Sequence, residues 1–102
     1  MPLKRLKELN TTDNLWIYIL KLLEKEPMHA YVIRKEVHRR FGFMPGTVTA
    51  YKVLYLLGKS GLVSKESSGR QKVYTITPDG RKALKQGIEF YRDRVRLLEG
   101  KL

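Results

Sequence analysis

The chain has 102 residues, of which 21 are Lys or Arg and 10 are Asp or Glu, so its net charge at pH 7 is +11. This length allows one domain with a modest core, in a size range where dimerisation often adds stability. The chain contains no cysteine, which excludes disulfides, thiolate zinc sites and cysteine nucleophiles. The longest apolar run, residues 15–20, is too short to span a membrane, and the first ten residues lack the apolar core of a signal peptide. We therefore expect a cytoplasmic protein without a membrane partner, and the basic charge favours a polyanion such as nucleic acid.

The first predicted helix covers residues 15–23, because Thr11, Thr12 or Asp13 can cap its start and Pro27 prevents its continuation. It is apolar almost all round, which predicts burial on two sides. One face is expected to pack in the domain and another to meet a second element or subunit. Residues 13–26 carry two lysines and three acidic residues, so this helix is electrically unlike the basic segments that follow.

The second predicted helix covers residues 29–41 and ends at Gly42. We expect its apolar side chains to face the core, namely Tyr31, Val32, Val37 and Phe41. The basic side chains are expected outside, namely Arg34, Lys35, Arg39 and Arg40. Pro45 prevents this helix from running directly into the next one.

A third helix is predicted after Gly46, where apolar residues recur at the 3, 4, 3 spacing of one buried face: Ala50, Val53, Leu54 and Leu57. The opposite face collects Val48, Tyr51, Lys52, Tyr55 and Lys59. The hydroxyl of Thr47 is expected to cap the start of the helix, and Gly58, Ser60 and Gly61 supply flexible residues for its end.

Two short strands are predicted next, over residues 62–66 and 72–77, and the second alternates Tyr74 and Ile76 with smaller residues as a half-buried strand does. Residues 67–71 have the composition of a turn. Arg70 and Lys72 therefore lie at the tip of a hairpin, where a long cationic side chain can reach a phosphate or a minor groove. Three helices followed by such a hairpin are typical of a winged helix-turn-helix.

The last segment, residues 79–102, has the spacing of a coiled coil. Its apolar residues recur at intervals of 4, 3, 4, 3 and 4: Leu84, Ile88, Tyr91, Val95, Leu98 and Leu102. Packing of this stripe on its own domain is the alternative, and Gly87 weakens the helix by roughly 1 kcal/mol relative to alanine. A homodimer would cover both this stripe and the second apolar face of the first helix, with Trp16 at the interface.

We therefore predict one domain over residues 1–102, mainly α with a small β-hairpin. Residues 13–78 form a winged-helix DNA-binding part, and residues 79–102 form a coiled-coil-like dimerisation helix. No catalytic or metal site is expected, because His29 and His38 are nine residues apart and fall on opposite sides of a helix. Glu24, Glu26 and Glu36 alternate with basic residues and are interpreted as solvated ion pairs. No Gly-rich phosphate loop or other sign of a cofactor is present.

Across residues 15–84 the chain resembles the PadR family of transcriptional regulators. The matching residues are, in chain order, Pro27, Met28, His29, Ala30, Tyr31, Thr49, Tyr51, Gly61, Leu62, Val63, Gly69, Arg70, Tyr74, Ile76, Thr77 and Gly80. Lys52 stands where the family has proline and Tyr55-Leu56 where basic residues are common, so the DNA sequence that is read cannot be carried over. The resemblance implies a dimeric, repressor-like protein that is not an enzyme, with one C-terminal dimerisation helix as in the small PadR subgroup.

Two such subunits would place their third helices in successive major grooves about 34 Å apart, so the operator should be an inverted repeat. Candidates for base edges or adjacent phosphates are Thr47, Thr49, Lys52 and Tyr55, with Lys59 on the same face. Lys52 is the residue expected to read guanine. Tyr51 contacts phosphate through its hydroxyl or is a half-buried packing residue. Arg34, Lys35, Arg70 and Lys72 are expected to bind the DNA backbone.

Two other functions stay open, an architectural protein that binds any duplex through charge and a winged-helix module that docks a protein. Tyr55 and Leu56 are compatible with the second, since apolar surface on a reading helix suits a protein partner as well as a thymine methyl. Trp16 and Tyr18 at the expected dimer interface are candidates for a pocket that takes a small aromatic effector, or they are core residues.

Overall fold

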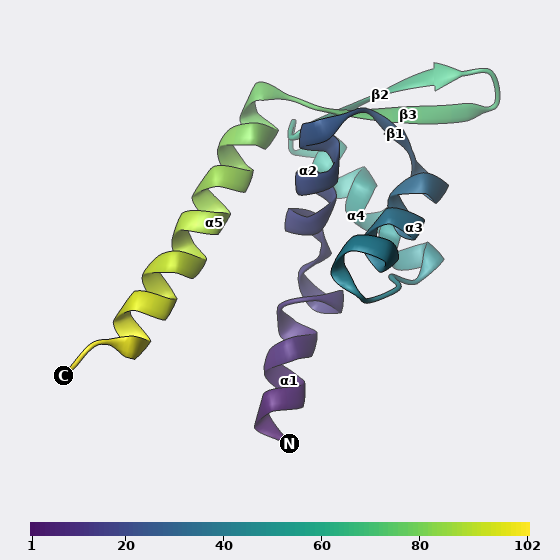
Figure 1. The fold of residues 1–102 in the computed structure, drawn as a ribbon. Coiled ribbons are helices and arrows are strands. Elements are labelled where there is room, and N and C mark those ends of the chain that lie inside the picture. Colours follow the sequence, from purple (N-terminus) through teal and green to yellow (C-terminus); the bar gives the residue numbers. More distant parts are fainter.

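The computed structural model describes residues 1–102 and consists of helices around one small antiparallel sheet (Figure 1). The helices are α1 (Pro2–Leu9), a short 3-10 turn η1 (Thr12–Asn14), α2 (Leu15–Lys25), α3 (Ala30–Phe41), α4 (Thr47–Lys59) and α5 (Pro78–Glu99). The strands are β1 (Met28–His29), β2 (Val63–Ser68) and β3 (Gln71–Ile76). The predicted class, mainly α with a β-hairpin wing after three core helices, is confirmed.

The core is built around α2, which packs against α3, α4, α5 and β3. Six of the eleven residues of α2 are buried, and Ile19 and Leu20 are completely enclosed. They meet Ile33 and Val37 of α3 and Leu54 of α4 in one cluster of 17 buried apolar residues. Most apolar side chains of the first predicted helix are therefore buried within their own chain.

The sheet has the order β1-β3-β2, with all strands antiparallel. The long hairpin pairs Val63 with Ile76 at its base and Ser68 with Gln71 at its tip. A two-residue turn, Gly69-Arg70, joins the strands, and Gly69 has φ +65°, which suits a residue without a side chain. The predicted turn is therefore longer than the real one, because Ser67 and Ser68 pair in the ladder.

Two expectations about individual residues are wrong, and one helix was missed. Thr47 does not cap α4 through its hydroxyl; the N-cap is Gly46, and Thr47 is the first helical residue. Tyr31 is 47% exposed, because the core positions of α3 are taken by Ala30, Ile33 and Val37. The helix α1 was not predicted at all, and none of its residues is buried.

The start of α5 is fixed by a close contact with the turn that precedes the hairpin. The hydroxyl of Thr77 accepts a hydrogen bond from the Gly80 amide (3.0 Å) and donates one to the carbonyl oxygen of Gly61 (2.7 Å). A Cβ at position 80 would lie 2.1 Å from the carbonyl oxygen of Leu62. Gly87 has a similar role where α5 crosses α2, since a Cβ there would lie 2.7 Å from Cδ1 of Ile17.

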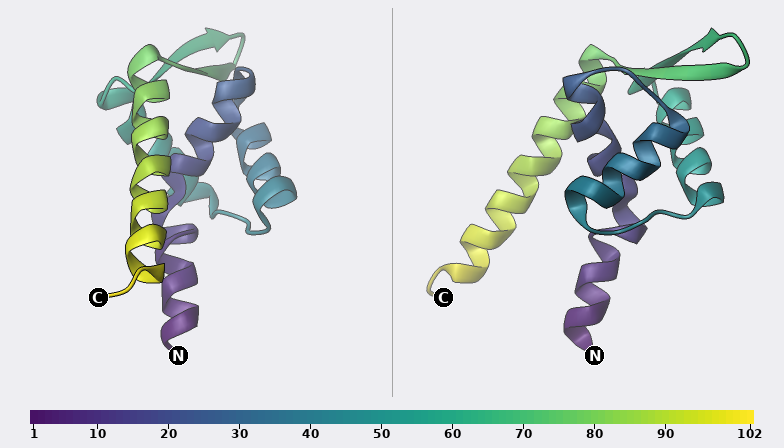
Figure 2. Two further views of the ribbon diagram at one scale, coloured as in Figure 1. Left: turned by 60° about the vertical axis from the view of Figure 1, so that its left-hand side comes forward. Right: turned by 45° about the vertical axis from the view of Figure 1, so that its right-hand side comes forward.

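Beyond this crossing α5 leaves the body of the molecule, and α1 projects at the same end, where both termini lie (Figures 1 and 2). The radius of gyration is 14.8 Å, compared with about 13 Å for a compact domain of this length. Leu84 is buried in the core of its own chain, so its expected place at a subunit interface is wrong. The helix ends at Glu99, so Leu102 does not continue the predicted helical stripe. No helix has the length and apolar character that crossing a membrane requires.

Candidate nucleic-acid interface

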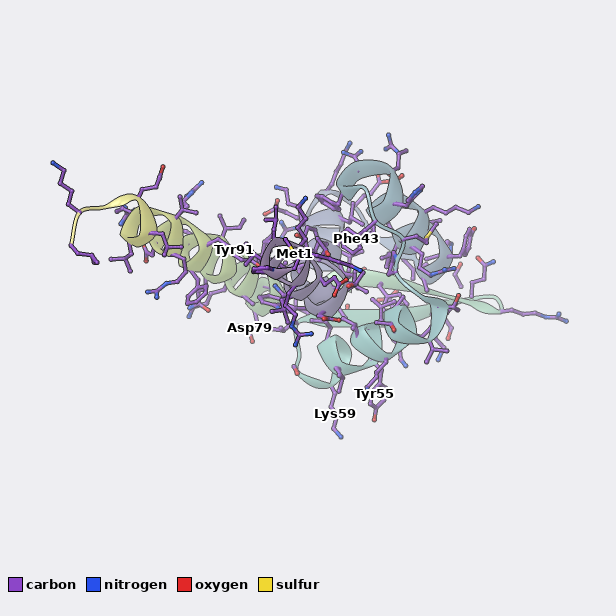
Figure 3. All side chains as sticks on the ribbon, turned by 90° about the horizontal axis from the view of Figure 1, so that it is seen from below. Met1, Phe43, Tyr55, Lys59, Asp79 and Tyr91 are labelled. Carbon is purple, nitrogen blue, oxygen red and sulfur yellow. The ribbon has the colours of Figure 1, made fainter.

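The outer face of α4 is formed by side chains that play no part in the core. Val48, Lys52, Tyr55 and Lys59 follow one another at spacings of 4, 3 and 4, so they lie along one side of the helix, and all of them are exposed. Tyr51 and Thr47 border this side toward the hairpin, and Thr49 borders it on the other. Figure 3 shows Tyr55 and Lys59 pointing away from the body of the protein. The sequence prediction for this face is confirmed as far as exposure is concerned.

The cations of this face of α4 and of the β2–β3 hairpin have no acidic partners within the chain. No Asp or Glu occurs between Glu36 and Glu66, a stretch that includes the whole of α4. The chain forms four salt bridges, and none of them involves Lys52, Lys59, Arg70 or Lys72. Their charges are therefore available to an external anion.

A crevice of about 450 Å³ lies where the start of α3, the middle of α4 and the hairpin meet. Its lining includes His29, Tyr31, Tyr51, Arg70 and Lys72. The rings of His29 and Tyr31 are stacked, with centroids 5.7 Å apart and planes 8° from parallel. The structure thus brings together Tyr51 of α4 and two cations of the wing, which were predicted separately. The participation of His29 was missed because β1 is too short to show a periodic pattern, and that of Tyr31 was missed because it was expected to face the core.

Tyr51 faces this crevice and is about half exposed, so its hydroxyl can contact an external group. Beneath it, burial raises the pKa of Tyr74, and the proximity of Tyr51 adds to the shift. Tyr74 therefore remains a neutral phenol at physiological pH. Of the two alternatives that the sequence left open for Tyr51, the half-buried packing role is partly realised, since the residue lies beside Tyr74 of the sheet and is about half exposed. Its contact with phosphate stays a prediction.

A second hollow, of about 510 Å³, lies between the last turns of α4 and strand β2. Tyr55 and Lys59 line it from the helix, and Ser64 and Lys65 line it from the strand. Lys65 was not predicted as a site residue, although its position in the first strand of the hairpin beside Lys59 makes it a further cation on the same face. Together the two hollows follow α4 along its junction with the wing.

The two basic residues predicted on α3 have different surroundings. Arg34 is half-buried, and its Nε donates a hydrogen bond to the carbonyl oxygen of Pro45 (3.1 Å), which ties α3 to the loop that leads into α4. Lys35 is exposed, and its Nζ lies 5.9 Å from the centre of the Tyr31 ring. Lys35 is thus free for a phosphate, whereas Arg34 has a role in positioning α4.

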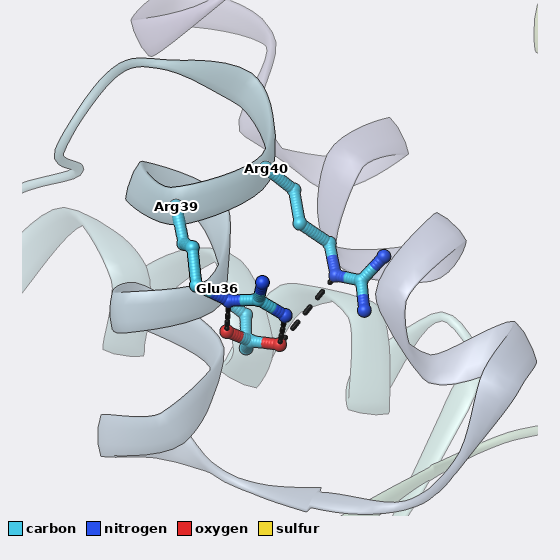
Figure 4. Close-up of polar contacts among 3 residues, drawn as sticks. All are labelled: Glu36, Arg39 and Arg40. Carbon is cyan, nitrogen blue, oxygen red and sulfur yellow. Dashed lines mark hydrogen bonds and ion pairs between the residues drawn. The ribbon is translucent and has the colours of Figure 1, made fainter.

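The other two arginines of α3, Arg39 and Arg40, form ion pairs with Glu36 (Figure 4). Arg39 donates two hydrogen bonds to the carboxylate, from Nε (2.7 Å) and from Nη2 (2.9 Å), and Arg40 lies at 3.5 Å. The hydrogen bonds from Arg39 lower the pKa of Glu36 to about 2. A carboxylate held in its charged form in this way cannot act as a general acid near neutral pH. Of the three predicted ion pairs, that of Glu24 is present with Lys21 and that of Glu36 with Arg39 and Arg40, whereas Glu26 forms none.

Trp16 and Tyr18 do not share a pocket. Tyr18 donates a hydrogen bond to the carbonyl oxygen of Asn10 (2.6 Å) and packs edge-on against Phe41 and Phe43. Trp16 points to the opposite side of α2, into a hollow of about 270 Å³ whose lining also includes Phe90 and Tyr91 of α5. The expectation of one aromatic pocket built from both residues is therefore wrong.

Comparison with known proteins agrees with the resemblance seen in the sequence. The model of the family described as the transcriptional regulator PadR-like family matches residues 19–86. A comparison with curated protein sequences gave no match.

Among solved structures, a protein of Thermoplasma acidophilum is 31% identical, with 85% of this chain and 90% of that one covered and a TM-score of 0.69. A PadR family transcription regulator of Clostridium difficile is 26% identical, with coverages of 83% and 97% and a TM-score of 0.70. The fold is also that of Bacillus subtilis PadR, solved in complex with operator DNA, which is 23% identical, with coverages of 72% and 46% and a TM-score of 0.68. The chain therefore belongs to the PadR-like family, a family of transcriptional regulators and not of enzymes.

Proposed function

We propose that the protein is a sequence-specific regulator that binds double-stranded operator DNA through α4 and the β2–β3 wing. The observation that carries this proposal is the unpaired basic face, in which Lys52 and Lys59 of α4 and Arg70 and Lys72 of the wing have no acidic partner. In this arrangement α4 enters the major groove, and the wing cations contact the backbone on one side of it. Bacillus subtilis PadR, which shares the fold, was solved in complex with operator DNA, and this supports DNA as the partner.

We further propose that it acts as a homodimer on an inverted repeat and that binding represses transcription. Two exposed apolar stripes support the dimer. One runs along α1 through Leu3, Leu6 and Leu9, and the other along the outer half of α5 through Val95 and Leu98. Helix α1 and the outer half of α5 project at the same end of the molecule (Figure 2). A two-fold axis at this end would bury each stripe twice and leave both copies of α4 free to bind DNA.

Fluorescence anisotropy against the DNA upstream of the protein's own gene and a shuffled duplex of equal length tests this proposal. We expect a preference of roughly a thousandfold or more for the native duplex at physiological salt. Alanine at Lys52 should reduce that preference, whereas alanine at Lys72 should weaken binding to both duplexes alike. Equal and steeply salt-dependent binding to both duplexes contradicts sequence-specific recognition of this site and favours an architectural role.

A docking module for another protein is the alternative that the exposed Tyr55 and Leu56 support. It differs from the proposal in its response to salt. A protein complex on apolar side chains should survive nuclease treatment and high salt, whereas a DNA complex should not. Absence of binding to either duplex would favour this alternative.

For a small aromatic effector, the hollow beside Trp16 is the site that we propose. It lies between α2 and α5, so a bound ring would contact the helix that leaves the domain. Titration with aromatic compounds should change the fluorescence of Trp16, the only tryptophan of the chain. An unchanged emission across the panel rules out this hollow as the effector site.

A further inference from the structure

The first turn of α4 carries an apolar side chain that neither the core nor helix formation explains. Val48 is 82% exposed, while three other positions of the same helix, Ala50, Leu54 and Leu57, supply its buried face. β-Branched residues are also slightly unfavourable in helices, so valine does not stabilise α4 by its intrinsic propensity. A partner that binds to this face would account for an apolar residue at this position.

Val48 lies at the place from which a recognition helix reads bases. It is the second residue of α4, and in helix-turn-helix proteins the N-terminal residues of the recognition helix contact base edges. Lys52 follows one turn later on the same side, and Tyr55 lies a further turn along. The cations that flank this line, on α4 and on the wing, have no partners in the chain, which matches the charge of a DNA duplex.

The hydrogen-bonding side chains most suited to reading bases are missing from this helix. Between Thr47 and Lys59 there is no Arg, Asn or Gln, so of the residues that form paired hydrogen bonds with guanine or adenine only lysine is present, at positions 52 and 59. Apart from Lys52, Lys59, the threonines and the tyrosines, the exposed surface of α4 is apolar. The C5-methyl of thymine is the one methyl group that an unmodified base pair presents in the major groove.

We propose that Val48 reads the C5-methyl of a thymine, so that each half-site of the operator has thymine at the position that Val48 contacts. This inference rests on the proposed function, because it assumes that α4 lies in the major groove. It assigns sequence discrimination to a residue that forms no hydrogen bond through its side chain. Lys52 then contributes a donor next to the methyl contact.

The test uses the full-length protein and a duplex selected by it from a random-sequence library. The selected duplex is resynthesised with deoxyuridine in place of every thymine, which removes the methyl groups and keeps base pairing. Burial of one such group corresponds to about a fourfold change in affinity, and to about fifteenfold when both half-sites lose it. We expect the deoxyuridine duplex to bind the unmodified protein weaker by about this factor.

Two variants show whether Val48 causes the weaker binding of the deoxyuridine duplex. Val48→Ala should bind the thymine duplex more weakly and should distinguish it less from the deoxyuridine duplex, because the shorter side chain makes a smaller contact with the methyl group. Lys59→Ala, the matched control on the same exposed face, should weaken binding to both duplexes and keep the ratio between them. Both changed residues are exposed, so neither variant should lose the fold, which circular dichroism verifies.

The outcomes separate this inference from the proposed function. A selected duplex that binds equally well with thymine or deoxyuridine overturns the methyl contact and leaves sequence-specific binding intact. A thymine preference that is as large in Val48→Ala as in the unmodified protein overturns the role of Val48. A library from which no duplex is enriched overturns the proposed function together with this inference, and the apolar face is then open to a protein partner.

Discussion

Glycine at position 80 is required by the backbone that passes over it. The carbonyl oxygen of Leu62 and Cγ1 of Ile76 would lie 2.1 and 2.7 Å from a Cβ at this position. The first contact is with main-chain atoms that belong to the turn between α4 and β2, so they cannot move aside as the end of a side chain does. The glycine therefore fixes how closely α5 approaches the base of the wing.

Gly80→Ala should destabilise the protein by about 3 kcal/mol, the upper part of the usual range for overpacking. Urea denaturation followed by circular dichroism measures the change in the free energy of unfolding. Gly58→Ala is the matched control, because a Cβ there meets no atom within 4 Å, and it should stabilise the helix by about 0.5 to 1 kcal/mol. Equal stability of the Gly80 variant and the unmodified protein would show that α5 is not held against this turn.

Glu36 makes a contribution to the free energy of unfolding that depends on pH. Its pKa is lowered from 4.5 to about 2 in the folded protein by the hydrogen bonds from Arg39. Since the folded-state pKa is the lower one, this stabilisation is present above about pH 4.5 and is lost as the pH falls toward 2. The free energy of unfolding of Glu36→Gln should therefore fall less between pH 6 and pH 2 than that of the unmodified protein.

Arg39→Gln removes the partner instead of the carboxylate and should reduce the pH dependence in the same way. Both effects should diminish in 1 M salt, because the pair lies near the surface and is screened. Parallel pH profiles for the unmodified protein and Glu36→Gln at low salt would mean that this ion pair does not form in solution.

Helices with one buried face were predictable from the sequence. Strand β1, which has two residues, and helix α1, which has no buried residue, were not. The 3.6-residue period located α4 and its buried residues Ala50, Leu54 and Leu57. Strand β1 has two residues and gives no period, although it pairs with β3 and helps to form the crevice. Helix α1 was missed although Leu3, Leu6 and Leu9 recur at helical spacing, and because none of its residues is buried, the fold of one chain does not explain these apolar side chains.

The candidate site was predictable where it depended on the exposed face of one helix. Lys52, Tyr55 and Lys59 follow from the period that buries the opposite face. The role of Arg34 could not be predicted, because its hydrogen bond to the carbonyl oxygen of Pro45 forms only after α3 and α4 have packed together. The crevice that joins Tyr51 to Arg70 likewise depends on how the wing folds back on α4, which no local pattern describes.

The wing makes a separate prediction, because Arg70 lies in its turn and has no ion pair in the chain. Arg70→Ala should reduce the slope of log K against log salt by about 0.9 for each subunit bound, the value for one phosphate contact. Lys101→Ala removes the same charge at the far end of the molecule and should leave the slope unchanged. Anisotropy titrations at four salt concentrations measure both, and an unchanged slope for Arg70→Ala would remove the wing tip from the interface.

The whole molecule is longer than a compact domain because two helices extend beyond its core. Its principal extents are 56 × 30 × 21 Å, and the far end consists of α1 and the outer half of α5. The apolar side chains there, Leu3 and Leu6 on one helix and Leu98 on the other, are among the most exposed of the chain. The core of the winged helix and these stripes occupy different regions, so loss of the stripes should affect assembly without unfolding the domain.

Leu98→Asp tests this separation, because Leu98 is 85% exposed in the single chain and contributes little to its own core. In the proposed dimer the change removes two buried leucines, each corresponding to about 1.5 to 3 kcal/mol, and places two charges in the interface. The dissociation constant of the dimer should therefore rise by about two orders of magnitude or more, which sedimentation velocity across a concentration series measures. Leu102→Asp adds the same charge beyond the end of α5 and should leave the dimer intact. A Leu98→Asp protein that remains dimeric would place the subunit contact elsewhere, and one that unfolds would show that the outer half of α5 belongs to the fold of the single chain.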